Sequence, residues 1–246
     1  MTAAESYLAE LTRRLRTVLG EELVGVYAGG SYALGEYEPG RSDLDVAAVA
    51  RAAVPPEVAH EVVAAVRHEA LPCPARGLEF VLYPLETTRS ATTRAGFSLN
   101  LNTGAGMTFR AELEPSPSEE HWFAIDRSIL AQQGIALAGP PAAEVFAPIP
   151  RQAILPVLLA SLEWHGGGAA RADDVVLNAA RSLRFAVEGT WSAKREAGQW
   201  ALAALDDAHV VASALAARTG DGAVAPAEAE RFRRRVTDRV RALARI

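Results

Sequence analysis

The sequence predicts an α+β fold in its first part and an all-helical arrangement in the rest. Near the N-terminus, apolar residues recur at helical spacing, and short apolar runs bounded by turn formers follow, as expected of strands. A proline-rich connector, Gly134–Pro150, then interrupts the chain, and every later segment has helical periodicity. We therefore expect one domain at 1–150 and a helical domain at 151–246.

Residue spacing and turn formers assign the elements one by one. Apolar residues every three or four positions predict helices, and short apolar runs predict strands. The expected order is a helix over Glu5–Leu19, strands over Glu22–Ala28 and Asp43–Ala50, a helix over Pro56–Glu69, strands over Leu78–Tyr83 and Phe97–Asn102, and a helix over His121–Gln133. Glycine and proline between Thr103 and Ser118 predict a loop. The later helices are expected over Arg151–His165, Asp173–Glu188, Ala193–Ala204, Asp206–Arg218 and Pro226–Arg245.

Composition narrows the function classes. The formal net charge is −5, which gives no general affinity for nucleic acid, and the basic run Arg231–Ile246 is interpreted as a solvated helix face. No apolar stretch reaches the roughly 18 residues of a membrane span, and no signal peptide is recognisable. The single cysteine, Cys73, excludes an internal disulfide and a cysteine zinc site. We expect a cytoplasmic protein without nucleic-acid or membrane partners.

Three acids stand on the expected strands. Asp43 and Asp45 are one residue apart, so on a strand both side chains point to the same face. Glu79 lies inside the apolar strand LEFVLYP and points away from its two apolar neighbours. If the three carboxylates share a face, a divalent cation must offset their charges, and oxygen ligands favour Mg²⁺. The turn Gly29–Ser31 after the preceding strand lets backbone N–H groups approach a phosphate.

Simpler interpretations of these acids are open at this point. Asp43 and Asp45 can mark a solvated strand start that completes a turn. Glu79 can pair with an arginine such as Arg76 and do no chemistry. The choice depends on whether the fold brings the three carboxylates together.

The spacing of these residues resembles a known family. The pattern G-S, eleven intervening residues and D-L-D, which begins at Gly30, is similar to the nucleotidyltransferase fold of the DNA polymerase β superfamily. The segment DVVLNAARSLRFAVEGTWSAKREAGQWAL, 174–202, resembles the helical domain of streptomycin/spectinomycin adenylyltransferases. In that family an arginine and a lysine of this domain reach the nucleotide phosphates, and Arg181 and Lys194 stand at those positions.

The resemblance implies an enzyme that transfers AMP from ATP, with Mg²⁺, to a hydroxyl of an aminoglycoside or aminocyclitol antibiotic. Pyrophosphate is released, and antibiotic resistance is the implied outcome. The implied fold is an N-terminal nucleotidyltransferase domain with a small mixed sheet and flanking helices, followed by an all-helical domain. Asp43 and Asp45 are the implied metal ligands and Glu79 the general base. The implied nucleotide-binding residues are Gly30, Ser31, Ser42, Arg181 and Lys194.

The acceptor half of the resemblance is incomplete. Streptomycin-modifying members carry a tryptophan and an acid in the loop that corresponds to His165–Asp174, but this loop has no tryptophan after Trp164. We therefore expect spectinomycin as the acceptor rather than streptomycin, and a monomeric protein. The acceptor-binding candidates are Glu79, Trp164, Asp173 and Asp174. The alternatives are transfer to another small molecule or to a protein, and a catalytically weak nucleotide-binding regulatory module.

Overall fold

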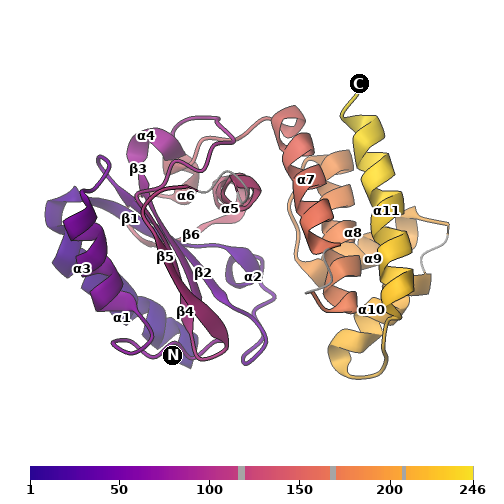
Figure 1. The fold of residues 1–246 in the computed structure, drawn as a ribbon, viewed down its shortest axis with the longest axis horizontal. Coiled ribbons are helices and arrows are strands. Elements are labelled where there is room, and N and C mark those ends of the chain that lie inside the picture. Colours follow the sequence, from indigo (N-terminus) through magenta and orange to yellow (C-terminus); the bar gives the residue numbers. More distant parts are fainter. Residues whose placement is uncertain (116–119, 167–169, 207–208, 246) are drawn as a thin grey trace. The chain divides into compact units, whose positions relative to one another are not determined.

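The structure is a computed structural model that describes residues 1–115, 120–166, 170–206 and 209–245 (Figure 1). The chain divides into two compact units, Met1–Pro148 and Ile149–Ile246. The first unit contains a mixed sheet with helices on both faces, and the described elements of the second unit are helices. The chain therefore has a mixed α+β fold. None of the described helices combines the length and the apolar character that crossing a membrane requires.

In the described part of the first unit, six strands form one sheet in the order β5-β4-β3-β2-β1-β6. Their bounds are β1 Leu23–Ala28, β2 Leu44–Ala50, β3 Leu78–Pro84, β4 Leu99–Gly104, β5 Met107–Glu112 and β6 Ile135–Ala138. The central pair β2 and β3 is parallel, and the other neighbouring strands are antiparallel. Helix α3, Pro56–Val66, lies between β2 and β3 in the chain. Because β2 and β3 run in the same direction, their first residues lie next to each other at the same end of the two strands.

Strand side chains alternate between two apolar cores on opposite faces of the sheet. One core joins strand residues to α3 and to α1, Ala3–Leu19. The other joins residues such as Tyr27 and Tyr83 to α5, Glu120–Gln133, and α6, Ala142–Val145. Three short helices complete the unit: a 3₁₀ turn at Gly20–Glu22, α2 at Gly30–Ala33 and α4 at Leu85–Thr88. A polar residue in β2 or β3 therefore faces one core or the other, depending on whether its position along the strand is odd or even.

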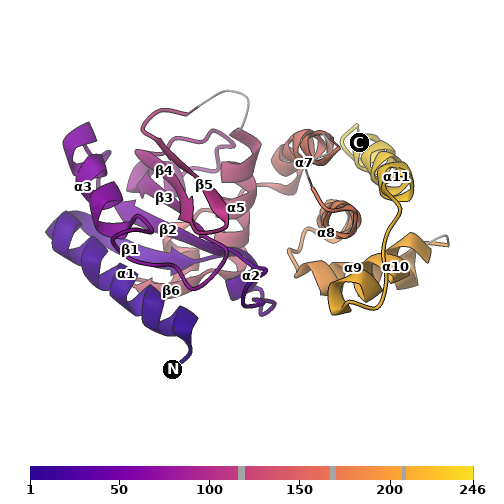
Figure 2. The same cartoon turned by 60° about the horizontal axis from the view of Figure 1, so that its bottom comes forward.

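Helix α8 is the centre of the second unit. Figure 2 shows it end-on among the other described helices of this unit, and it packs against each of them. The bounds are α7 Arg151–His165, α8 Ala172–Glu188, α9 Lys194–Ala204, α10 His209–Thr219 and α11 Pro226–Leu243. α8 ends at Gly189, whose φ of 73° is the left-handed conformation that glycine adopts readily. Polar residues along α8 can therefore meet side chains from several helices.

Two segments for which the sequence predicts irregular structure contain strands. The prediction of a loop at Thr103–Ser118 is wrong over Met107–Glu112, because these residues form β5, which pairs with β4. Residues 116–118 lie outside the described part of the chain. The connector predicted at Gly134–Pro150 includes β6, which pairs with β1. Both are edge strands without a buried residue. β5 has no apolar run, and the apolar run of β6, IALA, is only four residues long and is followed by the glycines and prolines of the connector. The helix expected at Asp206–Arg218 is α10, which starts at His209, and residues 207–208 lie outside the described chain.

Candidate active site

Asp45 and Glu79 lie side by side at the start of β2 and β3. They are partners in the parallel register, and neighbouring strands are about 4.8 Å apart. The flanking residues Leu44, Leu78 and Phe80 are buried in the core that contains α1 and α3. Both carboxyl groups therefore point to the opposite face, the face covered by α5.

Glu79 is a half-buried carboxyl among other acids. Burial raises its pKa most, and the negative charges of Asp45, Asp43 and Asp126 raise it further. The positive charge of Arg76 acts in the opposite direction but does not prevent a pKa well above the ordinary value. Glu79 therefore interacts electrostatically with both aspartates, and Asp126 brings a fourth carboxylate from α5.

Arg76 binds Asp43. Its Nε donates to Asp43 Oδ1 at 2.7 Å and its Nη2 to Oδ2 at 2.6 Å, a two-point ion pair. The side chain of Arg76 is 49% exposed and that of Asp43 is 19% exposed, so the pair lies at the surface. The Arg76 guanidinium is thus bound to Asp43, a carboxylate that the family resemblance implies as a metal ligand.

The backbone at Gly30 lies against the Asp45 carboxylate. The φ angle of Gly30 is 47°, and a Cβ atom at this position would overlap Asp45 Oδ2. The N–H of Gly29 donates to the Asp45 backbone oxygen at 2.8 Å, which fixes the turn to β2. Ser31 follows within α2, where its backbone oxygen accepts from the Glu36 N–H at 2.8 Å. No residue with a side chain fits at Gly30 without moving Asp45.

Ser42 closes the turn that leads into β2. Its hydroxyl oxygen accepts the Glu38 N–H at 3.0 Å, and its backbone oxygen accepts the Arg76 N–H at 3.2 Å. Accepting through a lone pair leaves the hydroxyl hydrogen able to donate. Ser42 therefore stands next to Asp43 with a donor of the kind that binds phosphate oxygens.

The acids fit a magnesium ion that is shared with a nucleotide. Within the described residues, no three His, Cys, Asp or Glu side chains are already grouped to hold a metal. Mg²⁺ in nucleotide enzymes uses one or two carboxylates and completes its shell with phosphate oxygens and water. Asp43 and Asp45 supply two carboxylates of this kind. The Arg76 guanidinium bound to Asp43 is a positive charge at the place where the metal ion would bind. The donor set therefore suits Mg²⁺ bound together with its phosphates.

Asn102 is a site neighbour that sequence reasoning missed. It is the antiparallel register partner of Glu79 on β4, so the two side chains share a face at contact distance. The alternation in Leu99–Gly104, LNLNTG, buries the leucines and turns the asparagines to the Glu79 face. That period-two pattern is the signal in the sequence that could have identified Asn102.

In the second unit, Lys194 forms an ion pair with Asp174, Nζ to Oδ1 at 2.9 Å. Arg218 of α10 reaches the same oxygen at 3.7 Å. Burial lowers the pKa of Lys194, Asp174 raises it, and the nearby charges of Arg181 and Arg218 lower it further. The sequence predicted Arg181 and Lys194 but not Arg218, which lies beyond the segment that carries the resemblance.

Arg181 is positioned by a short chain of polar contacts. Its Nη2 donates to Asn178 Oδ1 at 3.2 Å, and its guanidinium lies 6.0 Å from the centre of the Trp191 ring. The Asn178 amide nitrogen is 3.0 Å from His165 Nε2, and His165 Nδ1 is 2.7 Å from the Ser161 backbone oxygen. With the proton on Nδ1, His165 donates to the Ser161 backbone oxygen and its Nε2 accepts from Asn178, which leaves Asn178 Oδ1 to accept from Arg181.

The acceptor candidates of the second unit are in different environments. Asp173 is buried and pairs with Arg171 Nε at 3.2 Å, and Asp174 pairs with Lys194 and Arg218. An acceptor amine would have to displace these cations. Trp164 is 49% exposed, and its ring lies edge-on to that of His165 with the centroids 5.1 Å apart. Residues 167–169 of the neighbouring loop lie outside the described chain.

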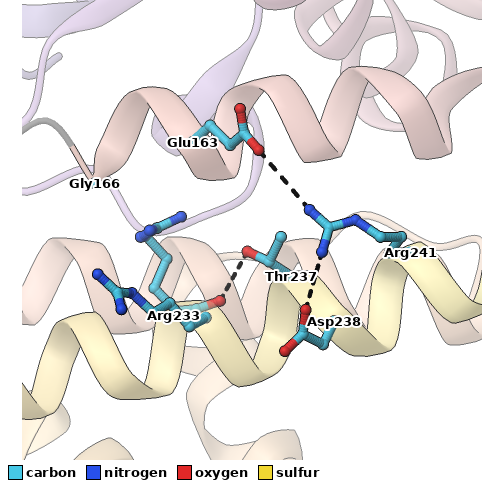
Figure 3. Close-up of a pocket in the computed structure, with 7 residues that line it drawn as sticks. Glu163, Gly166, Arg233, Thr237, Asp238 and Arg241 are labelled. Carbon is cyan, nitrogen blue, oxygen red and sulfur yellow. Dashed lines mark hydrogen bonds and ion pairs between the residues drawn. The ribbon is translucent and has the colours of Figure 1, made fainter.

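A separate cavity of about 460 Å³ lies between the end of α7 and α11 (Figure 3). Glu163 faces Arg241 at 3.9 Å, and Arg241 also pairs with Asp238 at 3.0 Å. Arg233 pairs with Glu230 and donates to the Leu162 backbone oxygen at 3.0 Å. The arginines of this cavity are bound to acids and to a backbone oxygen, and these contacts join α7 to α11.

Two family models match the chain, and so does a solved structure. The model "Nucleotidyltransferase domain" matches residues 9–70, and "Aminoglycoside adenylyltransferase, C-terminal domain" matches residues 144–243. The crystal structure of spectinomycin adenyltransferase AAD(9) from Enterococcus faecialis with ATP and spectinomycin is similar at a TM-score of 0.71 and 14% identity, covering 96% of this chain and 98% of that chain. The chain is an aminoglycoside adenylyltransferase-like nucleotidyltransferase. A search of curated proteins finds no match.

The resemblance inferred from the sequence is thus confirmed for this nucleotidyltransferase. The range 9–70 contains Asp43 and Asp45, and the range 144–243 contains Arg181 and Lys194. Glu79 lies outside both ranges, so its assignment rests on its register with Asp45. The structural match, at its low identity, shows a shared fold.

Proposed function

We propose that this nucleotidyltransferase transfers AMP from ATP to a hydroxyl of an aminocyclitol, with spectinomycin preferred to streptomycin. The observation that carries the proposal is the pairing of Asp45 with Glu79 across β2 and β3. The similar fold of a spectinomycin adenyltransferase crystallised with ATP and spectinomycin supports it. Drug resistance, a cytoplasmic location and a monomeric state are parts of the same proposal.

Glu79 accepts the proton of the acceptor hydroxyl. The hydroxyl oxygen then forms a bond to the α-phosphorus of ATP, the bond from that phosphorus to the bridging oxygen breaks, and pyrophosphate leaves. Because burial and neighbouring acids raise the pKa of Glu79, it is a stronger proton acceptor than an exposed glutamate. Asn102, its register partner, is placed to orient the attacking hydroxyl.

Asp43 and Asp45 would hold Mg²⁺ with the nucleotide, and Arg76 would then release Asp43. When bound, the ion would supply positive charge that stabilises the negative charge developing on the phosphate oxygens. Gly30 keeps Asp45 in place through backbone contact. Ser31 and Ser42 donate to phosphate oxygens.

The helical domain, 151–246, carries two cations that the family resemblance assigns to the nucleotide phosphates. Arg181 and Lys194 bind the phosphates, with Arg181 oriented by Asn178. Trp164 and the acids Asp173 and Asp174 are the acceptor-binding candidates of this domain. The loop that carries them lacks a second aromatic platform, which disfavours an extended acceptor such as streptomycin.

Pyrophosphate release from Mg-ATP with a panel of acceptors tests this function. We expect release with spectinomycin and little with streptomycin or without acceptor. Release with streptomycin alone would contradict the acceptor assignment. Mg-ATP binding without release for any aminocyclitol would favour another small molecule, a protein acceptor or a regulatory module.

A further inference from the structure

Asp126 lies on the side of α5 that faces the sheet. It follows Phe123 by three residues and precedes Leu130 by four, and residues at these spacings share one face of a helix. Phe123 and Leu130 are buried in the core that α5 forms with the strands. Leu130 and Asp45 both lie within 4 Å of the place that a Cβ on Gly29 would take. The carboxylate of Asp126 is therefore directed to the sheet face to which Asp45 points.

Asp126 is also close enough to Glu79 to affect its ionisation. Burial raises the pKa of Glu79 most, and the negative charges of Asp45, Asp43 and Asp126 raise it further. Asn102 stands on the other side of Glu79, as its register partner on β4. Within the first unit, Glu79 thus has an amide neighbour from β4 and an acid neighbour from α5.

Three of these four acids already have a task in the proposed reaction. Asp43 and Asp45 are assigned to Mg²⁺, and Glu79 is assigned to the proton of the attacking hydroxyl. The negative charge of Asp126 serves none of these steps. A further anion beside a carboxyl that must accept a proton is best explained by a cation that binds there, because an opposite charge favours the ionised acid.

We propose that Asp126 binds a charged amine of the acceptor, next to the hydroxyl that Glu79 activates. This inference rests on the proposed function. In an aminocyclitol, amines and hydroxyls stand on neighbouring ring carbons, so a hydroxyl placed at Glu79 brings an amine within reach of a second acid. The hydrogen bond between an ammonium group and a carboxylate is charge-assisted and stronger than a neutral one. A carboxylate offers about four acceptor positions, so Asp126 can bind the amine in addition to its present contacts.

Steady-state kinetics of Asp126→Asn, Asp126→Glu and Glu144→Gln test this inference, with spectinomycin and Mg-ATP each varied while the other is saturating. Glu144→Gln is the control, because Glu144 is an exposed acid of α6, a helix that packs against α5. We expect Asp126→Asn to raise the KM for spectinomycin by about 10- to 100-fold, the effect of a lost hydrogen bond between charged groups. The kcat and the KM for Mg-ATP should be unchanged, because only acceptor binding is lost. Asp126→Glu keeps the charge and should recover part of the loss.

Different outcomes overturn the inference and the proposed function. If the wild-type protein modifies spectinomycin and Asp126→Asn matches Glu144→Gln, Asp126 does not bind the acceptor although the proposed function stands. A lower kcat and weaker Mg-ATP binding in Asp126→Asn, at an unchanged KM for spectinomycin, would assign Asp126 to the metal site and overturn the inference. If the wild-type protein binds Mg-ATP but modifies no aminocyclitol, the proposed function is wrong. If thermal unfolding shows that Asp126→Asn does not fold, Asp126→Ser, with a smaller neutral side chain, decides by the same comparison.

Discussion

Asp45 and Glu79 are direct partners across the parallel strands β2 and β3, on the face of the sheet covered by α5. Two like charges so placed disfavour simultaneous ionisation, and burial adds to the effect. A bound cation would reduce this repulsion, as the proposed binding of Mg²⁺ with the nucleotide requires. The chemistry proposed for the first unit depends on the pairing of Asp45 with Glu79.

Replacing Glu79 with Gln should leave Mg-ATP binding near the wild-type value and lower kcat by about 10²–10⁴-fold, because a general base is lost while the fold is kept. Steady-state kinetics and ATP titration measure the two effects. Glu112→Gln is the control, since Glu112 is an acid of the same sheet that pairs with Arg110 at the edge strand. An equal loss of ATP affinity and rate in Glu79→Gln would assign Glu79 to metal binding instead.

Replacing Gly30 with Ala should abolish transfer, because the new Cβ overlaps the Asp45 carboxylate. Gly35→Ala is a matched control: its φ is also positive, at 70°, but nothing lies within 4 Å of an added Cβ. Both variants lose about 1–2 kcal/mol of stability through the left-handed backbone. Thermal unfolding and pyrophosphate release separate the two effects, and equal activity in both variants would contradict the role given to Gly30.

Replacing Arg76 with Gln should lower the Mg²⁺ concentration needed for half-maximal transfer, because the ion no longer competes with the guanidinium for Asp43. The exposed pair is worth about 0.2–1 kcal/mol, so a decrease of up to about fivefold is expected. Arg67→Gln is the control, since Arg67 pairs with Glu69 away from the three acids. If Arg76→Gln needs more Mg²⁺ than the wild type, Arg76 supports the metal site rather than competing with it.

Mg-ATP affinity should fall with rising pH, at a lower pH than an exposed lysine would give, because the proposed phosphate binding needs charged Lys194. Burial and the neighbouring cations lower the pKa of Lys194, so its charge is lost at a lower pH than that of an exposed lysine. Lys194→Arg keeps the charge and should remove this alkaline decline. Dissociation constants measured across the alkaline range check the prediction, and identical profiles for both proteins would contradict it.

The sequence was sufficient for the elements with strong periodicity. The long helices and the strands β1 to β3 follow from apolar spacing, and alternation places Glu79 on the face opposite Phe80. That Asp45 lies beside Glu79 on this face is known only from the strand register. The edge strands β5 and β6 were missed because β5 has no apolar run and β6 is a short apolar run next to the glycines and prolines of the connector. Their existence depends on β4 and β1, which a local pattern does not report.

Sequence patterns could not predict the ion pairs. Arg76 was considered as a partner of Glu79, yet it binds Asp43, because the choice depends on the turns that precede β2 and β3. Arg218 could not be linked to Lys194 because the packing of α9 and α10 on α8 brings them together. Contacts between distant segments of this kind require the folded chain.

The central claim is tested most directly by mass spectrometry of spectinomycin incubated with Mg-ATP and the wild-type protein, beside Asp45→Asn and a reaction with EDTA. We expect spectinomycin to gain the mass of AMP only with the wild-type protein and Mg²⁺. An unmodified drug in the wild-type reaction, or a full yield of adduct with Asp45→Asn, would contradict the account.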